Sequence, residues 1–244
     1  MDNCFNQIIY IDQLGSSNDY LINLYKEKKF FDPLTVYVNK QFSGRGRLGK
    51  TWYSGVNDGL CFSFSICLED SLQPFLIQTL VTISICKYLN LIQIDSFIKF
   101  PNDIYVEKQK IAGILCEKIS ANQKKYLIVG IGLNVNNIKY PKNLKNAISI
   151  AQLLGKQFNK KKVFNDLISK IKETMALYYL SNSEIDKIYM SHLHGTKDYV
   201  ICFYEQKKIK IKIIEIRQNN VLIAVDLNGQ IHHLKGSKIK FILN

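Results

Sequence analysis

Residues 44–52 read Gly44-Arg45-Gly46-Arg47-Leu48-Gly49-Lys50-Thr51-Trp52, a segment that combines closely spaced glycines with arginine and lysine. The glycines allow the backbone to approach a ligand closely and to take positive φ angles. The cationic side chains and the backbone N–H groups supply positive potential for a phosphate or a carboxylate. The segment therefore predicts a loop that holds an anion.

The same segment also matches two common nucleotide-binding patterns, G-x-x-x-x-G-K-[ST] from Gly44 to Thr51 and G-x-G-x-x-G from Gly44 to Gly49. Both patterns require a helix to begin where the loop ends, so that its N-terminus faces phosphate. Here a turn-rich stretch follows, and residues 60–68 then alternate between apolar and small residues as a strand does. Residues 35–41 also have a strand pattern. We therefore expect a loop between two strands and reject both matches.

The length and composition bound the class of protein. With 244 residues, 47% of them hydrophobic, the chain has room for one large domain and a small one. No apolar run reaches the ~18 residues that span a bilayer, and the N-terminus lacks the pattern of a signal sequence. We expect a soluble, cytoplasmic protein without a membrane partner.

Cysteine usage and net charge exclude some classes of site. The six cysteines contain no C-x-x-C pair, which argues against a disulfide framework or a zinc site. The net charge of +13 would suit a polyanionic partner, but the lysines are spread through nearly every segment. The charge alone establishes no nucleic-acid partner.

Hydrophobic periodicity predicts alternating strands and helices before residue 195. Ser16 and Ser17 can cap a helix that runs to about Lys29, and Ser71 can cap a helix from Pro74 to Leu89. Further helices are predicted at 150–154, 163–179 and 184–193, and strands at 7–11, 35–41, 60–68, 96–100, 104–106, 110–117 and 126–135. From Tyr199 onward the pattern is strand-like, with tight hairpins at Asn219-Asn220 and Asn228-Gly229. We expect an α+β domain in residues 1–194 and a small β-barrel in residues 195–244.

Two of these elements suggest chemistry. A hairpin after Pro101 would bring Asn102, Asp103 and Lys110 close together. Residues 126–135 form a continuously apolar strand, too apolar for a sheet edge, whose glycines leave space for a flat group against the backbone.

Four ordered blocks of the sequence resemble the biotin protein ligases, the biotin–[acetyl-CoA-carboxylase] ligases. The blocks are Ser16-Ser17-Asn18; Gln41 with Gly44 to Trp52; Lys99-Phe100-Pro101-Asn102-Asp103 with Lys110-Ile111-Ala112-Gly113-Ile114-Leu115; and Gly130-Ile131-Gly132-Leu133-Asn134. The resemblance spans essentially the whole chain. It implies a mixed β-sheet packed with helices, the class II synthetase-like catalytic domain of biotin and lipoate ligases, followed by an SH3-like β-barrel.

The chain departs from the pattern of that family at three positions. It has Lys50 where Arg is common, Phe100 where Trp is common, and Ser17 where Thr is common. Lys50 keeps the charge but loses the planar fork of a guanidinium group. Phe100 keeps an aromatic wall, and Ser17 keeps a hydroxyl group. None of the three removes a group that the chemistry requires.

The resemblance implies a two-step reaction with ATP, biotin and Mg²⁺. The carboxylate of biotin attacks the α-phosphate of MgATP to give biotinyl-5′-AMP and pyrophosphate. The adenylate then acylates a lysine of the biotin carboxyl carrier protein of acetyl-CoA carboxylase. The magnesium ligands, and the choice between a monomer and a homodimer, stay open.

The resemblance also implies roles for individual residues. Arg45, Arg47 and Lys110 would neutralise the two anions that meet in the first step. Asp103 would accept or orient the ammonium proton of the acceptor lysine in the second step. Trp52 would cover the adenine, and Ser16, Ser17, Asn18 and Gln41 would contact biotin. The full set of expected binding residues is Ser16, Ser17, Asn18, Gln41, Gly44, Arg45, Gly46, Arg47, Trp52, Asn102, Lys110, Gly113, Ile114, Gly130, Gly132 and Asn134.

Other interpretations of the same residues stay open at this point. Arg45 and Arg47 could form a solvated hairpin tip, Lys110 could be an exposed turn lysine, and Asp103 could only cap the turn after Pro101. The whole protein could instead be a lipoate or octanoate ligase, or a basic nucleic-acid-binding module whose affinity falls steeply with salt. The pattern of the family starts by residue 8, so we expect no helix-turn-helix before it and no binding to DNA.

Overall fold

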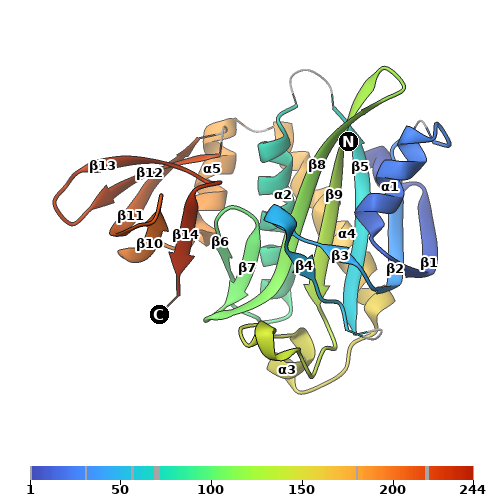
Figure 1. Ribbon diagram of the computed structural model, residues 1–244, viewed down its shortest axis with the longest axis horizontal. Helices are drawn as coiled ribbons and strands as arrows, with labels where there is room; N and C mark the ends of the chain where they lie inside the picture. The colour runs from blue at the N-terminus through green and yellow to red at the C-terminus, as the bar shows by residue number, and fades with distance from the viewer. Residues whose placement is uncertain are drawn as a thin grey trace.

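A computed structural model describes residues 2–30, 32–55, 58–68, 72–179, 181–217 and 220–243. A seven-stranded sheet with helices on both faces forms the larger part of the molecule, and a five-stranded sheet follows it at the C-terminal end (Figure 1). The predicted α+β class is therefore confirmed. The predicted domain boundary between residues 194 and 195 stays a prediction. The chain is tied there by hydrogen bonds from His194 N to Ile98 O and from Ile213 N to Gly195 O.

The large sheet is mixed. Its strands, in spatial order, are β1 (Ile8–Leu14), β2 (Thr35–Gln41), β5 (Gly59–Cys67), β9 (Lys124–Asn134), β8 (Gln109–Ala121), β7 (Asp103–Val106) and β6 (Phe97–Lys99). Strands β1 and β2 are parallel and joined by a helix, whereas the other neighbouring strands pair antiparallel. Strand β9 lies in the interior of the sheet, as its continuous apolar run predicts.

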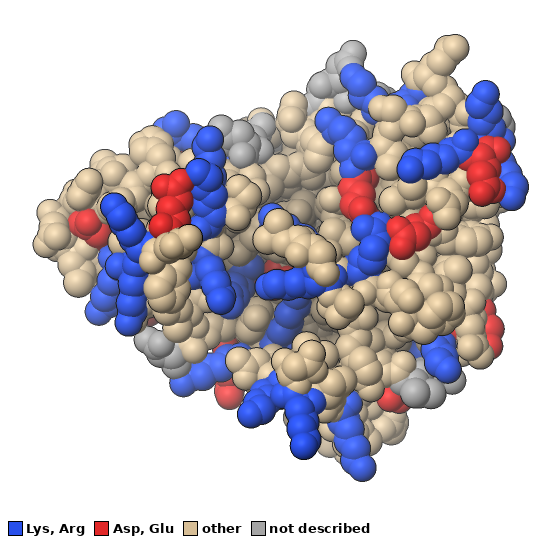
Figure 2. All heavy atoms as spheres, viewed as in Figure 1, with Lys and Arg blue, Asp and Glu red and all other residues tan. Residues whose placement is uncertain are grey.

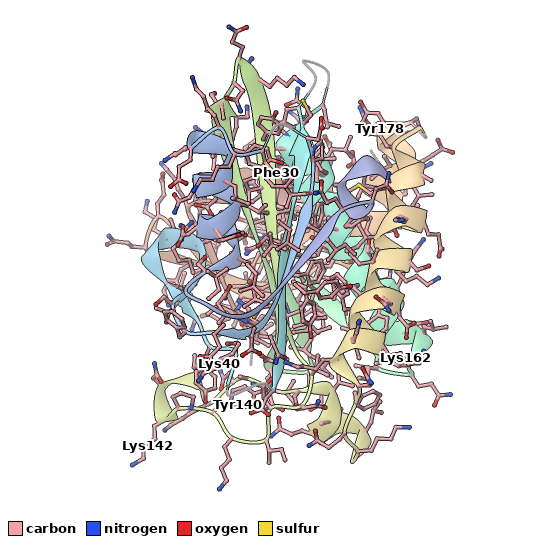
Figure 3. All side chains as sticks on the ribbon, turned by 90° about the vertical axis from the view of Figure 1, so that its right-hand side faces the viewer. Phe30, Lys40, Tyr140, Lys142, Lys162 and Tyr178 are labelled. Carbon is pink, nitrogen blue, oxygen red and sulfur yellow. The ribbon has the colours of Figure 1, made fainter. Side chains whose placement is uncertain are left out.

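Helices cover both faces of this sheet. Helix α1 (Ser17–Lys26) packs on one face, where Leu21 and Tyr25 join a core cluster with alternate residues of β2 and β9. Helices α2 (Pro74–Leu91) and α4 (Lys160–Met175) cover the other face (Figure 3). Helix α5 (Asn182–His192) packs beside α2. Shorter helical segments are η1 (Asp2–Phe5), η3 (Lys142–Leu144), α3 (Ile150–Leu154) and η4 (Ala176–Tyr179).

Both faces of strand β5 are buried. Phe62 and Phe64 are buried against the cluster that contains α2 and α4. Ser63 and Ser65 point to the opposite face and are equally buried. The small residues of the alternation therefore face a second covered surface rather than water, and their hydroxyl groups are hydrogen-bonded, as burial requires.

Helix α2 is the one described helix whose length and hydropathy would allow it to cross a membrane, with a mean hydropathy of 1.2 over 18 residues. In this protein 67% of that segment is buried in the interior, between the sheet and helices α4 and α5. The helix begins after Gln73, with Pro74 in its first turn. Ser71, the predicted cap, lies outside the described residues.

The C-terminal sheet is antiparallel and open. Its strands, in spatial order, are β13 (Ile231–Lys235), β12 (Val221–Asp226), β11 (Lys207–Arg217), β10 (Val200–Tyr204) and β14 (Ile239–Ile242). Residues 236–238 connect β13 to β14, the two edge strands, so the sheet must curl. Within the described residues, however, no ladder joins these edges, and the expected barrel is not closed. The hairpin at Asn228-Gly229 is confirmed, whereas Asn219 lies outside the described residues.

Candidate functional site

A cavity of about 410 Å³ opens between the large sheet, the segment after β9 and the C-terminal sheet. Figure 2 shows a hollow on this face with Lys and Arg side chains around it. Every expected binding residue except Gly44 lines this cavity. The lining set includes Ser16, Ser17, Asn18, Gln41, Arg45, Gly46, Arg47, Trp52, Asn102, Asp103, Lys110, Gly113, Ile114, Gly130, Gly132 and Asn134. Segments far apart in the sequence therefore meet at one cavity.

The glycine-arginine segment forms a hairpin over this cavity. Strands β3 (Gly44–Arg45) and β4 (Thr51–Trp52) pair antiparallel, and the short turn η2 (Arg47–Gly49) connects them. Gly44 takes part in the pairing rather than in the lining. A Cβ atom added to Gly44 would lie 2.5 Å from the carbonyl oxygen of Trp52. The expected strand-loop-strand arrangement is confirmed, and in the described residues after Trp52 no helix begins where either nucleotide-binding pattern requires one.

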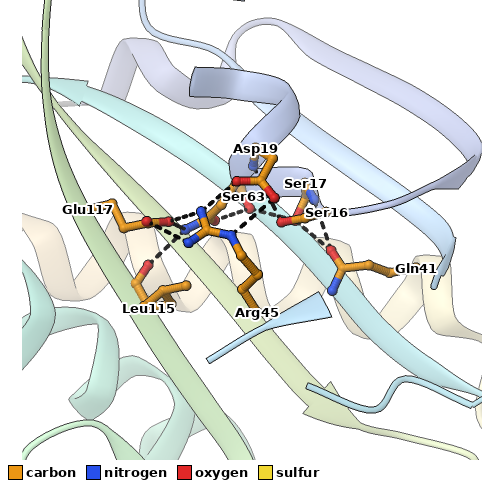
Figure 4. Close-up of polar contacts among 9 residues, drawn as sticks. Ser16, Ser17, Asp19, Gln41, Arg45, Ser63, Leu115 and Glu117 are labelled. Atoms are coloured by element: carbon orange, nitrogen blue, oxygen red, sulfur yellow. Dashed lines mark hydrogen bonds and ion pairs between the residues drawn. The ribbon is translucent and has the colours of Figure 1, made fainter. Parts of the chain in front are cut away.

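Arg45 ties this hairpin to the large sheet and to helix α1. Its Nη1 and Nη2 atoms donate to the two carboxylate oxygens of Glu117 at 2.9 and 2.7 Å, and its Nε atom donates to Asp19 at 3.0 Å (Figure 4). A two-pronged contact of this kind fixes orientation as well as distance. The positive charge of Arg45 is therefore offset by two carboxylates. Neither Asp19 nor Glu117 had been identified from the sequence.

A buried polar network lies beside this contact. Gln41 Oε1 accepts from the backbone N–H of Ser17 at 2.9 Å and from its hydroxyl group at 3.2 Å. The hydroxyl group of Ser63 lies 2.6 Å from both Ser17 Oγ and Asn18 Oδ1. Ser16 caps helix α1 by accepting from Asp19 N. The expected capping role of Ser16 is confirmed, and Ser63 is a member of the network that sequence reasoning missed.

The glycines of β9 make room for side chains of the protein itself. A Cβ atom at Gly130 would lie 2.2 Å from Asn18 Oδ1, and one at Gly132 would lie 2.2 Å from Trp52 Cε2. The expectation of a flat group against this strand is therefore met by the indole ring of Trp52. Both residues must be glycine because a side chain would displace Asn18 or Trp52.

The β7–β8 hairpin brings Asp103 and Lys110 together, as its sequence predicts. Lys110 Nζ lies 2.7 Å from Asp103 Oδ1, and both side chains are about seven-tenths buried. The ammonium group also lies 5.4 Å from the ring centroid of Trp52. Lys110 is therefore a held cation at the cavity wall rather than an exposed turn lysine.

Two asparagines hold the surrounding segments in place. Asn102 accepts from Arg47 Nη1 at 2.9 Å and donates to the carbonyl group of Ile114 at 2.7 Å. Asn134 donates to the carbonyl groups of Lys110 and Ile148. Arg47 lines the cavity and is held there by the neutral side chain of Asn102. In the described contacts, no carboxylate offsets its charge.

The cavity as a whole is strongly cationic. Among the residues that the structure describes, its lining carries six cations and one carboxylate, Asp103. The cations are Arg45, Arg47, Lys50, Lys99, Lys110 and Lys240. The sequence had not indicated Lys240 or the other lining residues of the C-terminal sheet, because only the folded chain brings that sheet to the cavity. Walls of one charge sign concentrate ligands of the opposite sign, so the cavity suits a polyanion.

Gly132→Ala is predicted to expel the indole ring from its place on β9. Trp52 is the only tryptophan in the chain, so its fluorescence reports this change directly. We expect a red shift of the emission and a loss of about 1–3 kcal/mol in the free energy of unfolding, as overpacking causes. The matched control is Gly130→Ala, which strains Asn18 on the same strand and leaves the emission unchanged. Wild-type emission from Gly132→Ala would contradict the contact.

Comparisons with known proteins agree with this arrangement. A sequence model of the biotin/lipoate A/B protein ligase family matches residues 10–134. The Arabidopsis thaliana protein "Biotin--protein ligase 1, chloroplastic" is 31% identical over an alignment of 249 residues, covering 93% of this chain and 64% of that protein. "Biotin--protein ligase 2" from the same plant is 33% identical, covering 57% of this chain and 48% of that protein. The chain thus spans between about half and two thirds of the length of these relatives.

A solved structure resembles the whole chain. The biotin protein ligase from Aquifex aeolicus, in complex with biotin and ATP, superposes with a TM-score of 0.82 at 25% identity. The superposition covers 98% of this chain and 100% of that one. The fold agrees along the full length, and the sequence model of the family matches just over half of the chain. The chain therefore belongs to the biotin/lipoate A/B protein ligase family.

Proposed function

We propose that this chain is an ATP-dependent biotin protein ligase. It would form biotinyl-5′-AMP and transfer biotin to a lysine of the biotin carboxyl carrier protein of acetyl-CoA carboxylase. The observation that carries the proposal is one cavity lined both by a neutral polar network and by a cationic wall. Such a cavity can hold a neutral headgroup at one end while a carboxylate meets a phosphate at the other. The named relatives and the solved biotin and ATP complex support it.

The polar end suits the cyclic urea of biotin. Among the described contacts, Ser16 uses its hydroxyl oxygen as an acceptor, and Gln41 accepts through Oε1. The hydroxyl proton of Ser16 and the Nε2 group of Gln41 therefore remain free to donate to a urea carbonyl. An aliphatic dithiolane would leave both donors, one on the buried Ser16 and one on the half-buried Gln41, without partners, and a site built to donate hydrogen bonds disfavours such a ligand. The geometry favours biotin over lipoate.

The cationic wall suits the adenylation step. Two anions must approach each other when a carboxylate attacks a phosphate, and fixed cations lower that barrier. Lys110 and Arg47 supply this charge beside Trp52, whose indole would cover the adenine. Arg45 is held by Glu117 and Asp19, so its proposed role is to position the hairpin.

The side chains that line the cavity are compatible with a Mg²⁺ ion that is bound mainly by the phosphates of the nucleotide. Among the residues that the structure describes, no three His, Cys, Asp or Glu side chains cluster as a metal site. Asp103 is the one carboxylate of the lining, and Mg²⁺ commonly uses one or two carboxylates together with substrate phosphates. When bound, the ion would neutralise phosphate charge.

Asp103 is the proposed partner of the acceptor lysine in the transfer step. Its side chain is 28% exposed and is held by Lys110, so it can receive a hydrogen bond from an incoming ammonium group. A carboxylate in this position orients the amine and accepts its proton as the amide bond forms.

The experiment that tests the proposed function is ATP–pyrophosphate exchange with purified protein. Biotin, lipoate and octanoate are compared side by side as the acid. Exchange that depends on biotin is the expected result. Exchange only with lipoate or octanoate would identify the chain as a lipoate or octanoate ligase instead. If no acid supports exchange, the proposed adenylation reaction is refuted.

Lys110→Ala is predicted to slow biotin-dependent exchange by about 10²–10³-fold, because a fixed cation beside the reacting groups is lost. The matched control is Lys108→Ala, an exposed residue on the turn of the same hairpin. Circular dichroism checks that both variants keep the wild-type fold. Near-normal exchange by Lys110→Ala would exclude its role in adenylation.

Asp103→Asn is predicted to slow the transfer of biotin from preformed biotinyl-AMP to the carrier protein by at least about 10²-fold. The substitution keeps the shape of the side chain and removes its ability to accept a proton. Single-turnover transfer is measured, so that adenylate formation does not limit the rate. An unchanged transfer rate would leave Asp103 with a structural role only.

A further inference from the structure

Lys99 is a cation in the cavity lining that takes part in none of the described ion pairs and was not among the expected binding residues. It ends strand β6, is half-buried and lines the cavity. Asp103 lies directly opposite Lys99 in the β6–β7 register, but its carboxylate pairs with Lys110 at 2.7 Å. The contacts that the structure describes give Lys99 no carboxylate partner. Placing a cation in a half-buried position without a carboxylate contact costs free energy, so another interaction must offset this cost.

Aromatic rings hold the ammonium group of Lys99 in place. Lys99 Nζ lies 4.8 Å from the ring centroid of Tyr105. Phe97 stacks on Tyr105 with centroids 6.1 Å apart and also packs against His194 at 5.0 Å. The amine therefore has a supported position and is not a free surface lysine.

The surroundings of Lys99 are poor in negative charge and rich in positive charge. Burial lowers its pKa, and repulsion from Lys110, Lys50 and Lys240 adds to this effect, while attraction to Asp103 opposes it. Lys50 and Lys240 also line the cavity and also lack ion pairs in the described contacts. A polyanion that entered here would relieve the repulsion among these lysines.

The order of strands places Lys99 beyond the adenylation centre. The indole ring of Trp52 lies against Gly132 of β9, Lys110 is on β8, Asp103 is on β7, and Lys99 is on β6. Neighbouring strands are about 4.8 Å apart, so β6 lies roughly 10 Å from β8. Lys240, on the C-terminal sheet, lines the same end of the cavity. A chain of phosphates that starts at Lys110 would extend toward Lys99.

We propose that Lys99, supported by Lys240, binds the two phosphates of ATP that leave as pyrophosphate. The inference rests on the proposed function. In that step a carboxylate oxygen of the acid bonds to the α-phosphorus, and the bond from the α-phosphorus to the bridging oxygen breaks. Pyrophosphate leaves with that electron pair, and the ammonium group of Lys99 offsets the charge that accumulates on it.

Lys99→Met tests the inference, because methionine keeps an apolar stem against Tyr105 and removes the charge. We expect the KM for ATP and for pyrophosphate in the exchange reaction to rise at least about tenfold, with the KM for biotin unchanged. Lys99→Arg keeps the positive charge, so its KM values for ATP and for pyrophosphate should lie much closer to those of the wild type than to those of Lys99→Met. Lys108→Met, on the exposed turn of the β7–β8 hairpin, is the matched control and behaves as wild type.

Two binding measurements separate this inference from the proposed function. Calorimetry with inorganic pyrophosphate alone should show weaker binding to Lys99→Met than to the wild type, whichever acid the protein activates. A non-hydrolysable biotinyl-adenylate analogue, which lacks the leaving phosphates, should bind both proteins equally. Unchanged pyrophosphate affinity, or an equal loss of analogue binding, would overturn the role of Lys99. Absence of biotin-dependent exchange by the wild type would instead refute the proposed function.

Discussion

The contact between Arg45 and Glu117 holds together the site on which the proposed function depends. A hairpin with two residues in each strand has no independent stability, so its orientation must come from outside it. Arg45 supplies that orientation through Glu117 on β8 and Asp19 on α1. Both partners are partly exposed, and such pairs contribute at most about 1 kcal/mol to stability. The contact therefore matters for where it places Arg47 and Trp52, rather than for how much it stabilises the fold.

The charged side chains of the site differ in how far an opposite charge offsets them. Asp103 pairs with Lys110, two carboxylates offset the charge of Arg45, and in the described part of the chain the partner of Arg47 is the amide of Asn102. Lys99 lies over the ring of Tyr105 and, in the contacts between described residues, has no carboxylate partner. The excess positive charge is concentrated where an acid and a triphosphate would meet. These cations repel one another, and a polyanionic ligand would offset that repulsion.

Local sequence predicted those parts of the site that depend on local geometry. The pairing of Asp103 with Lys110 follows from a single hairpin, and the cap at Ser16 follows from a strand that leads into a helix. The strands around residues 35–41 and 60–68 were recognisable from period-two patterning. Their positions in the sheet were not, because neighbours in a sheet are chosen by the whole chain.

The features that sequence did not reveal all depend on long-range register. The alternation in residues 60–68 predicts a strand but not what covers each of its faces, and Ser63 is buried because both faces of β5 are covered. Glu117 meets Arg45 only because β8 passes beneath the hairpin, and Gly132 accommodates Trp52 rather than leaving open space. The open edges of the C-terminal sheet also could not be distinguished from a closed barrel, because strand patterns carry no information on closure.

The proposed function requires that biotin and ATP occupy adjacent parts of one cavity. Competition calorimetry with a non-hydrolysable biotinyl-adenylate analogue measures this. We expect the saturating analogue to abolish the binding of biotin and also that of ATP, because it fills both parts at once. Continued binding of either ligand to the analogue-saturated protein would show that the two sites are separate and would refute a shared cavity.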